Sequence, residues 1–167
     1  QLTDMSTLEQ CNKLHTLNLS NSRVSSIGQY NLTTINFNSC RNLSDITLLD
    51  KCHKLENLNL RGWSVTDVSV LGKCSKLHRL NLSLCPLTDV STLHNCNLHT
   101  LILKHCPITD VSTIGECSNL QTLDLSYCPI TNVSTLHKCN LHTLILNHCP
   151  LEDVTLEQCS NLHILDL

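Results

Sequence analysis

The sequence predicts a curved, right-handed repeat solenoid of the α/β type, with a parallel β-sheet on the concave face and short 3₁₀ or extended turns on the convex face. Two observations lead to this prediction. A Leu-x-x-Leu-x-Leu block recurs along all 167 residues, and a return segment of nearly constant length follows each copy. Aromatic residues make up only 2% of the chain, so leucine, valine, isoleucine and cysteine must form the core.

Each block is expected to form a short strand with one buried face, because apolar residues alternate with others at period two. Successive blocks start 18, 23, 22, 21, 22, 21 and 21 residues apart. One unit cannot bury its own leucines, so stacked units must share a continuous core. The blocks begin at Leu14, Leu32, Leu55, Leu77, Leu98, Leu120, Leu141 and Leu162.

The return segments are expected to end each strand and to carry one 3₁₀ turn on the convex side. Proline cannot donate to a strand ladder, and it follows the strand at Pro86, Pro107, Pro129 and Pro150. A recurring acidic or amide side chain is predicted to accept hydrogen bonds from the turn or to cap the helical turn. Its positions are Asp45, Asp67, Asp89, Asp110, Asn132 and Asp153.

The twelve cysteines fall into two columns of the repeat, and CxxC pairs are lacking. One column closes the strand block, and the other precedes the next block. Cysteine used in this way acts as a small buried residue, which favours free, inert thiols in a reducing compartment. Disulfides between stacked cysteines of neighbouring repeats are the alternative. The columns are Cys40, Cys85, Cys106, Cys128 and Cys149, and Cys11, Cys52, Cys74, Cys96, Cys117, Cys139 and Cys159.

Two units depart from the pattern. The first, from Leu14 to Asn31, is short, and Tyr30 takes the cysteine position there, so a local distortion is expected. In the third unit, Trp63 stands where the strand-closing cysteine belongs. An indole is not expected to fit a buried thiol position without rearrangement, and the preceding Gly62 would let the chain bulge.

Residues 1–167 are predicted to form a single domain of about seven full repeats with partial terminal repeats, as a fragment of a longer protein. The net charge of −3 is mild and its charges are dispersed, which argues against nucleic-acid binding. No apolar run approaches the roughly 20 residues of a membrane span, so we expect no membrane segment.

The repeats resemble the leucine-rich repeat superfamily along the whole chain. The return segment ITDVSTL is similar to the short repeats of bacterial internalins and phosphatase regulatory subunits. The two cysteine columns resemble the cysteine-containing repeats of F-box substrate receptors of ubiquitin ligases. The combination is also similar to RING-linked leucine-rich repeat proteins of trypanosome expression sites. The resemblance implies a solenoid that binds macromolecules, with no catalytic residues common to the superfamily.

The outward residues of the strands are the candidates for binding a protein partner on the concave face. Many are neutral and polar, and the column Asn18, Asn36, Asn59, Asn81 could instead be a self-satisfied hydrogen-bond ladder. The central units carry arginine, aromatic and aliphatic residues of the kind found at interface hot spots, although Trp63 could simply fill a packing defect. The predicted binding residues are Arg61, Trp63, Arg79, Ile102, Lys104, His105, Asp124, Tyr127, Ile145 and His148.

Enzymatic, metal and cofactor roles find no support in the sequence. Only four glycines occur, without a phosphate-binding loop, and no serine has a GxSxG context. His15, His78, His99, His142 and His163 share one repeat position. Two neighbouring imidazoles make an incomplete zinc site, so these histidines are interpreted as a solvated flank. No metal, cofactor or small-molecule substrate is expected.

The sequence therefore favours a non-catalytic interaction module of an intracellular regulatory or ubiquitin-ligase-type protein, in the cytoplasm or nucleus. The alternative is an extracellular or cell-surface recognition domain stabilised by disulfides. Five Asn-x-Ser/Thr sequons occur, and glycans on those of the concave face would obstruct a partner. The sequons begin at Asn18, Asn31, Asn42, Asn81 and Asn132.

Overall fold

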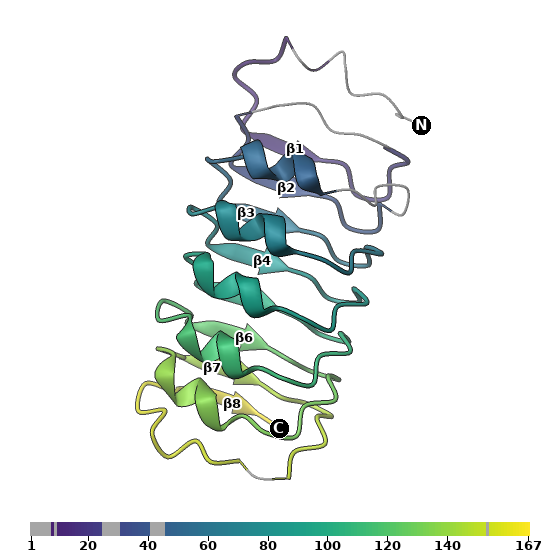
Figure 1. The fold of residues 1–167 in the computed structure, drawn as a ribbon. Helices are drawn as coiled ribbons and strands as arrows, with labels where there is room; N and C mark the ends of the chain where they lie inside the picture. Colours follow the sequence, from purple (N-terminus) through teal and green to yellow (C-terminus); the bar gives the residue numbers. More distant parts are fainter. Residues whose placement is uncertain (1–7, 9, 25–30, 41–45, 153) are drawn as a thin grey trace.

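The computed structural model describes residues 8, 10–24, 31–40, 46–152 and 154–167, and shows the strands stacked one above another with short helices on the opposite side (Figure 1). All strands are parallel and pair in sequence order in one sheet. They are β1 (Thr16–Asn18), β2 (Thr34–Asn36), β3 (Asn57–Asn59), β4 (Arg79–Asn81), β5 (Thr100–Ile102), β6 (Thr122–Asp124), β7 (Thr143–Ile145) and β8 (Ile164–Asp166). The predicted solenoid is confirmed.

The strands are in register, so equivalent residues of successive repeats pair directly. Leu58 of β3 lies opposite Leu80 of β4, and Leu80 lies opposite Leu101 of β5. These central side chains are at most 3% exposed. The residues on either side of them face away from the core, which confirms the outward columns expected from the leucine spacing.

Short 3₁₀ helices return the chain on the convex side, as the brief return segments predict. They are η2 (Thr47–Lys51), η3 (Ser69–Lys73), η4 (Ser91–Asn95), η5 (Ser112–Glu116) and η6 (Ser134–Lys138). Each helix from η3 to η6 begins at a serine whose backbone N–H donates to the side chain two residues earlier, at 2.7–2.8 Å. The acceptors are Asp67, Asp89, Asp110 and Asn132. The predicted capping role is confirmed for these four, whereas Asp45 and Asp153 lie outside the described residues.

The cysteine thiols connect successive repeats. Cys106 Sγ donates to the carbonyl oxygen of Leu82 at 3.1 Å, and Cys96 Sγ donates to that of Leu71 at 3.1 Å. Both carbonyls belong to the preceding repeat. All twelve cysteines are free thiols, so the alternative of disulfides between repeats is not what the structure shows. Most are buried, but Cys11 is exposed and the last of each column is half-buried.

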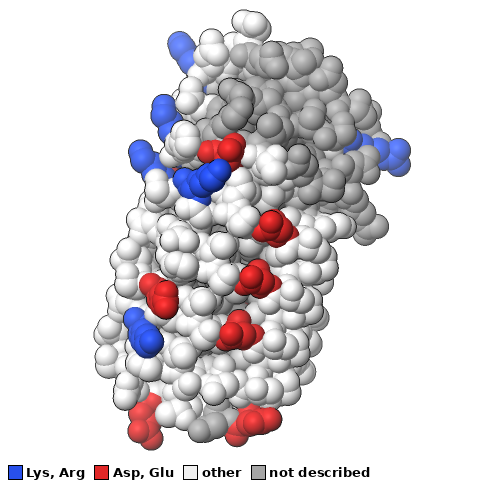
Figure 2. All heavy atoms as spheres, in the orientation of Figure 1, with Lys and Arg blue, Asp and Glu red and all other residues white. Residues whose placement is uncertain are grey.

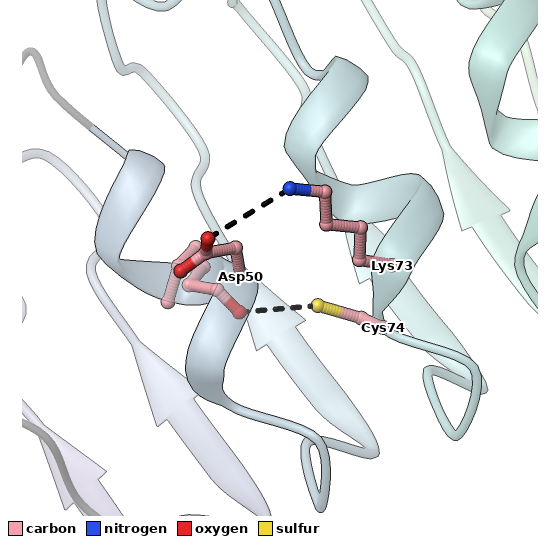
Figure 3. Close-up of polar contacts among 4 residues, drawn as sticks. Asp50, Lys73 and Cys74 are labelled. Atoms are coloured by element: carbon pink, nitrogen blue, oxygen red, sulfur yellow. Dashed lines mark hydrogen bonds and ion pairs between the residues drawn. The ribbon is translucent and has the colours of Figure 1, made fainter.

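Figure 3 shows one such junction, between η2 and η3, where Cys74 Sγ lies 3.4 Å from the carbonyl oxygen of Leu49. Beside it, Lys73 Nζ lies 3.8 Å from Asp50 Oδ2. The lysine is largely exposed, and exposed ion pairs contribute little to stability. Buried thiol and aliphatic contacts therefore hold this junction together more than the ion pair does.

Trp63 corrects one expectation, because it occupies the cysteine position while remaining 1% exposed. Its Nε1–H donates to the carbonyl oxygen of Phe37 at 2.7 Å, and the two rings lie 5.3 Å apart. The indole thus takes the place of the thiol as a donor to the preceding repeat. Gly62, at φ +72°, makes no special bulge, since the equivalent residues of other repeats also have positive φ.

The first unit is described only in part. Tyr30 and the return loop at residues 25–30 lie outside the described residues, so the distortion expected there is untested. Val24 and Cys40, on either side of the gap, are both buried. The core therefore continues from β1 to β2.

Replacing Trp63 tests its role in the core. We expect Trp63→Ala to lower the free energy of unfolding by about 3–5 kcal/mol, because a large buried ring is lost. Trp63→Phe keeps most of the packing and loses the hydrogen bond to Phe37, so its cost should be smaller. Urea unfolding followed by circular dichroism measures both. A cost below about 1 kcal/mol for the alanine variant would contradict the assignment of Trp63 to the core.

The thiol columns predict a loss of stability at alkaline pH. Burial raises the pKa of Cys74, Cys85, Cys117 and Cys128 to about 11, and of Cys96, Cys106 and Cys139 to about 12. In the unfolded chain the pKa of these thiols is about 9.0. The folded state then binds more protons above pH 9, so its stability is complete below that pH and falls as the pH rises towards 11–12.

Urea unfolding under reducing conditions at about pH 8 and about pH 10 measures this loss. Cys106→Ser is the matched control, because a hydroxyl still donates to Leu82 but does not ionise in this range. The variant should lose less stability than the wild type between the two pH values. Equal losses would show that the Cys106 thiol does not contribute.

Candidate partner-binding surface on the concave face

Residues of β2 to β5 line a hollow of about 350 Å³ on the concave face of the sheet. It combines amide and hydroxyl side chains and the guanidinium of Arg79 with the aliphatic side chains of Ile35, Leu58, Leu80 and Ile102. The lining residues are Thr34, Ile35, Asn36, Asn57, Leu58, Asn59, Arg79, Leu80, Asn81, Thr100 and Ile102. Because each strand contributes equivalent positions, the leucine register determines which side chains meet here.

The asparagine column is not a ladder between strands. Each Oδ1 accepts the backbone N–H two residues later in its own repeat: Asn36 from Asn38 at 3.1 Å, Asn59 from Arg61 at 3.0 Å and Asn81 from Ser83 at 2.9 Å. These side chains close the turn that ends each strand. The asparagines therefore do not form the hydrogen-bond ladder that the sequence left as an alternative. Each one caps its own turn, so all three amides have the same orientation.

The same column changes chemistry after β4. Ile102 and Ile145 are half-buried aliphatic residues, and neither can cap its turn. Asp124 keeps the capping bond, since its Oδ1 accepts from the Ser126 backbone at 2.9 Å. On β8, Asp166 Oδ2 accepts from Asn147 Nδ2 at 2.8 Å. The concave face is therefore amide-rich over β2 to β4, and aliphatic and acidic over β5 to β8.

The predicted cations lie on or beside this face. Arg79 of β4 lines the hollow, and Arg61 follows the last residue of β3 by two positions. Both side chains are exposed. Lys104 is half-buried, with Nζ 5.3 Å from the centre of the Tyr127 ring, a favourable cation–π distance.

Three predicted binding residues form one continuous ring stack at the edge of the sheet. His105 and Tyr127 lie 4.2 Å apart between ring centres, nearly parallel at 16°. Tyr127 and His148 follow at 4.4 Å and 21°. Leu84 holds the equivalent position one repeat earlier and is 47% exposed, while Tyr127 is 42% exposed. The stack forms an aromatic rim beside the hollow.

Sequence reasoning missed the backbone conformation of this rim. The residue before each strand-closing position has φ between 58° and 62° when it is not glycine. Asparagine and histidine tolerate this left-handed conformation better than leucine or tyrosine do. The sequence signal for this conformation was the choice of residue at this position, which is Asn21, Gly62, His105 or His148 in four of the repeats. The other members of the column are Ser39, Leu84 and Tyr127.

The predicted binding residues thus fall into three groups. Arg79, Ile102, Asp124 and Ile145 lie on the strands, and Arg61 and Lys104 lie just beyond them. His105, Tyr127 and His148 form the rim. Trp63 is buried, so its side chain cannot take part in an interface on this face, and that part of the predicted set was wrong.

The paired histidines are neighbours, as their repeat position predicts. His78 and His99 lie 4.8 Å apart between ring centres, and His142 and His163 lie 5.4 Å apart. Nδ1 of His78 and Nδ1 of His99 both lie 3.1 Å from the carbonyl oxygen of Asn97. Among the described residues, no group of three or more histidine, cysteine or acidic side chains is placed to hold a metal ion.

On the face seen in Figure 2, acidic and basic side chains lie in small groups separated by uncharged surface. No helix in the described part of the chain is long and apolar enough to cross a bilayer. The buried thiols with raised pKa values remain protonated at neutral pH, and a protonated thiol is a poor nucleophile.

Comparisons with known proteins agree with this geometry. Leucine-rich repeat family models match residues 96–136, as two repeat copies, and residues 73–91. No curated protein sequence matches the chain.

Three solved structures from Listeria monocytogenes are similar in fold. The internalin InlF has a TM-score of 0.87 at 26% identity, covering 97% of this chain and 50% of its own. The internalin InlC2 has a TM-score of 0.82 at 23% identity, and the match covers 98% of this chain and 75% of InlC2. The functional domain of InlJ, described as including a cysteine ladder, has 0.74 at 26%, covering 98% and 36%. This chain therefore spans half the length of InlF.

Proposed function

We propose that this chain, of which residues 73–91 and 96–136 match leucine-rich repeat models, is a non-catalytic scaffold that binds a protein partner on the concave face of its sheet. The observation that carries the proposal is that each repeat uses one set of residues for the core and turns and leaves another set on the surface. Leucines, thiols and capping carboxylates are committed to the core and the turns. The outward residues of the strands are exposed or half-buried and vary from repeat to repeat, as recognition requires.

The composition of the surface supports a protein partner. Arginine and tyrosine are enriched at interface hot spots, and Arg61, Arg79 and Tyr127 are all exposed. Ile102 and Ile145 add aliphatic groups that a partner would remove from water. We expect neither a nucleic acid nor a small-molecule substrate at this surface.

The thiols support a proposal for the compartment. Free, protonated thiols that donate hydrogen bonds within the core persist best where the surroundings are reducing, so we propose the cytoplasm or nucleus. A regulatory or ubiquitin-ligase-type protein fits that setting and the cysteine-containing repeats. The rival is a disulfide-stabilised extracellular domain. Titration of denatured protein without reductant should find all twelve thiols free, whereas fewer would support the rival.

Substitution of the concave face tests the function directly. We expect Arg61→Ala, Arg79→Ala and Tyr127→Ala together to abolish partner capture in a crosslinked pull-down, because the exposed contact groups are lost. The melting temperature should stay near that of the wild type, because these side chains lie outside the core.

The matched control changes three charged residues at the ends of convex helices: Lys73→Ala, Glu116→Ala and Lys138→Ala. This variant should capture the same proteins as the wild type. Loss of capture by the control, with the concave variant unaffected, would place the interface on the convex side and overturn the proposal.

A further inference from the structure

The capping bonds determine which end of each asparagine amide faces the concave surface. A backbone N–H can be accepted only by the amide oxygen, so Asn36, Asn59 and Asn81 turn their oxygens into the turns. Asn81 Oδ1 also accepts from Ser83 Oγ at 2.7 Å. Their NH₂ groups are left to project from the capped turns. Within the described residues, no acceptor is recorded for these three nitrogens.

Arg79 adds a fourth donor to the same hollow, and its guanidinium has no acceptor lone pair. Arg61 lies next to Asn59, whose amide oxygen accepts its backbone N–H at 3.0 Å. Among the residues that the structure describes, no aspartate or glutamate lines this hollow. The concave surface over β2 to β4 therefore presents the three amide NH₂ groups and the Arg79 guanidinium as donors. Asn57 Nδ2 is already bonded to Thr34 Oγ1 at 3.2 Å, and Glu56 lines an adjoining hollow together with Arg79.

The surface over β6 to β8 has the opposite polarity. Asp124 occupies the column position of Asn81, and its Oδ1 accepts both the backbone N–H of Ser126 at 2.9 Å and its hydroxyl at 2.5 Å. Where an asparagine projects an NH₂ group, Asp124 projects its second oxygen. Asp166 repeats this acidic character on β8, and Ile145 lies between it and Asp124. Ile102 lies between Asn81 and Asp124.

From this reversal we propose that the concave face binds an extended protein segment in one orientation, with its Asp or Glu residues over β2 to β4 and its Lys or Arg residues over β6 to β8. The proposal rests on the proposed function and adds the chemistry and direction of the partner. Acidic side chains satisfy the amide and guanidinium donors with charge-assisted hydrogen bonds. Opposite polarity at the two ends disfavours the reversed orientation.

The same charges favour a protein over a nucleic acid. A phosphate backbone carries its negative charge at every nucleotide, so it would meet Asp124 and Asp166 on the same face. Within the described residues, Arg61 and Arg79 are the arginines beside the donor-rich half, and the chain has a net charge of −3. A segment with acidic and basic residues at opposite ends matches both halves.

The test is an NMR titration of the isotope-labelled full chain at low salt with three probes: hexaglutamate, hexalysine and an eight-residue oligothymidylate. Hexaglutamate should shift the side-chain NH₂ signals of Asn36, Asn59 and Asn81. Hexalysine should instead shift backbone signals around Asp124 and Asp166. Either peptide acting at the other's site, or hexaglutamate shifting none of these asparagines, would overturn the proposed orientation.

The double variant Asn59→Asp with Asn81→Asp sharpens the test. Aspartate keeps the capping oxygen, as Asp124 does naturally, but replaces each donor with a negatively charged acceptor. We expect hexaglutamate affinity to fall at least tenfold with little change in melting temperature. The matched control, Asp124→Asn, should retain hexaglutamate affinity and weaken hexalysine binding. Unchanged hexaglutamate affinity in the double variant would remove the amides from the site.

The outcomes separate this inference from the proposed function. If the concave alanine variant loses partner capture but hexaglutamate does not shift the asparagine NH₂ signals, the proposed interface is supported and its assigned polarity is wrong. If the concave alanine variant still captures the partner, both fail. Oligothymidylate that shifts the same asparagine signals at least as strongly as hexaglutamate would overturn the choice of a protein partner.

Discussion

The whole structure depends on one constraint: a single repeat cannot bury its own leucines. In-register stacking resolves it by placing Leu58, Leu80 and Leu101 opposite one another in a parallel sheet. The thiols reinforce that stack, since most of them donate to a carbonyl of the preceding turn, as between Cys106 and Leu82. Burial raises the pKa of these thiols, which keeps them protonated and able to donate. Core packing and inter-repeat hydrogen bonding thus come from the same register.

The register also builds the candidate surface. When buried leucines align, the residues beside them align as well, and a difference between repeats becomes a difference between places on the concave face. At one repeat position, β4 carries Asn81 and β6 carries Asp124. Both side chains cap their turns, but the asparagine presents an NH₂ donor outwards and the aspartate presents an acceptor oxygen. Similarly, His105, Tyr127 and His148 share one backbone conformation and stack into a rim. Recognition can therefore vary without disturbing the scaffold.

Most of the fold could be predicted from the leucine spacing, because period-two alternation and a constant repeat length leave few arrangements. The capping role of Asp89 followed from turn chemistry in the same way. The sequence left burial of Trp63 and an exposed binding role as alternatives, since the choice depends on the Phe37 carbonyl in the preceding repeat. The orientation of the asparagine amides and the ring stack needed backbone positions that side-chain patterns do not contain. Residue types indicated the surface, while local hydrogen bonds determined its polarity.

The central claim is that outward residues of the strands bind a protein while the core only supports them. The most direct measurement is an isoleucine-methyl NMR spectrum of the free protein and of its complex with the captured partner. Ile102 and Ile145 are the half-buried isoleucines of the concave face, whereas Ile108, Ile114 and Ile130 are buried. The account predicts large shifts for Ile102 and Ile145, with the buried methyls nearly unmoved. Unchanged Ile102 and Ile145 signals in a saturated complex would contradict it.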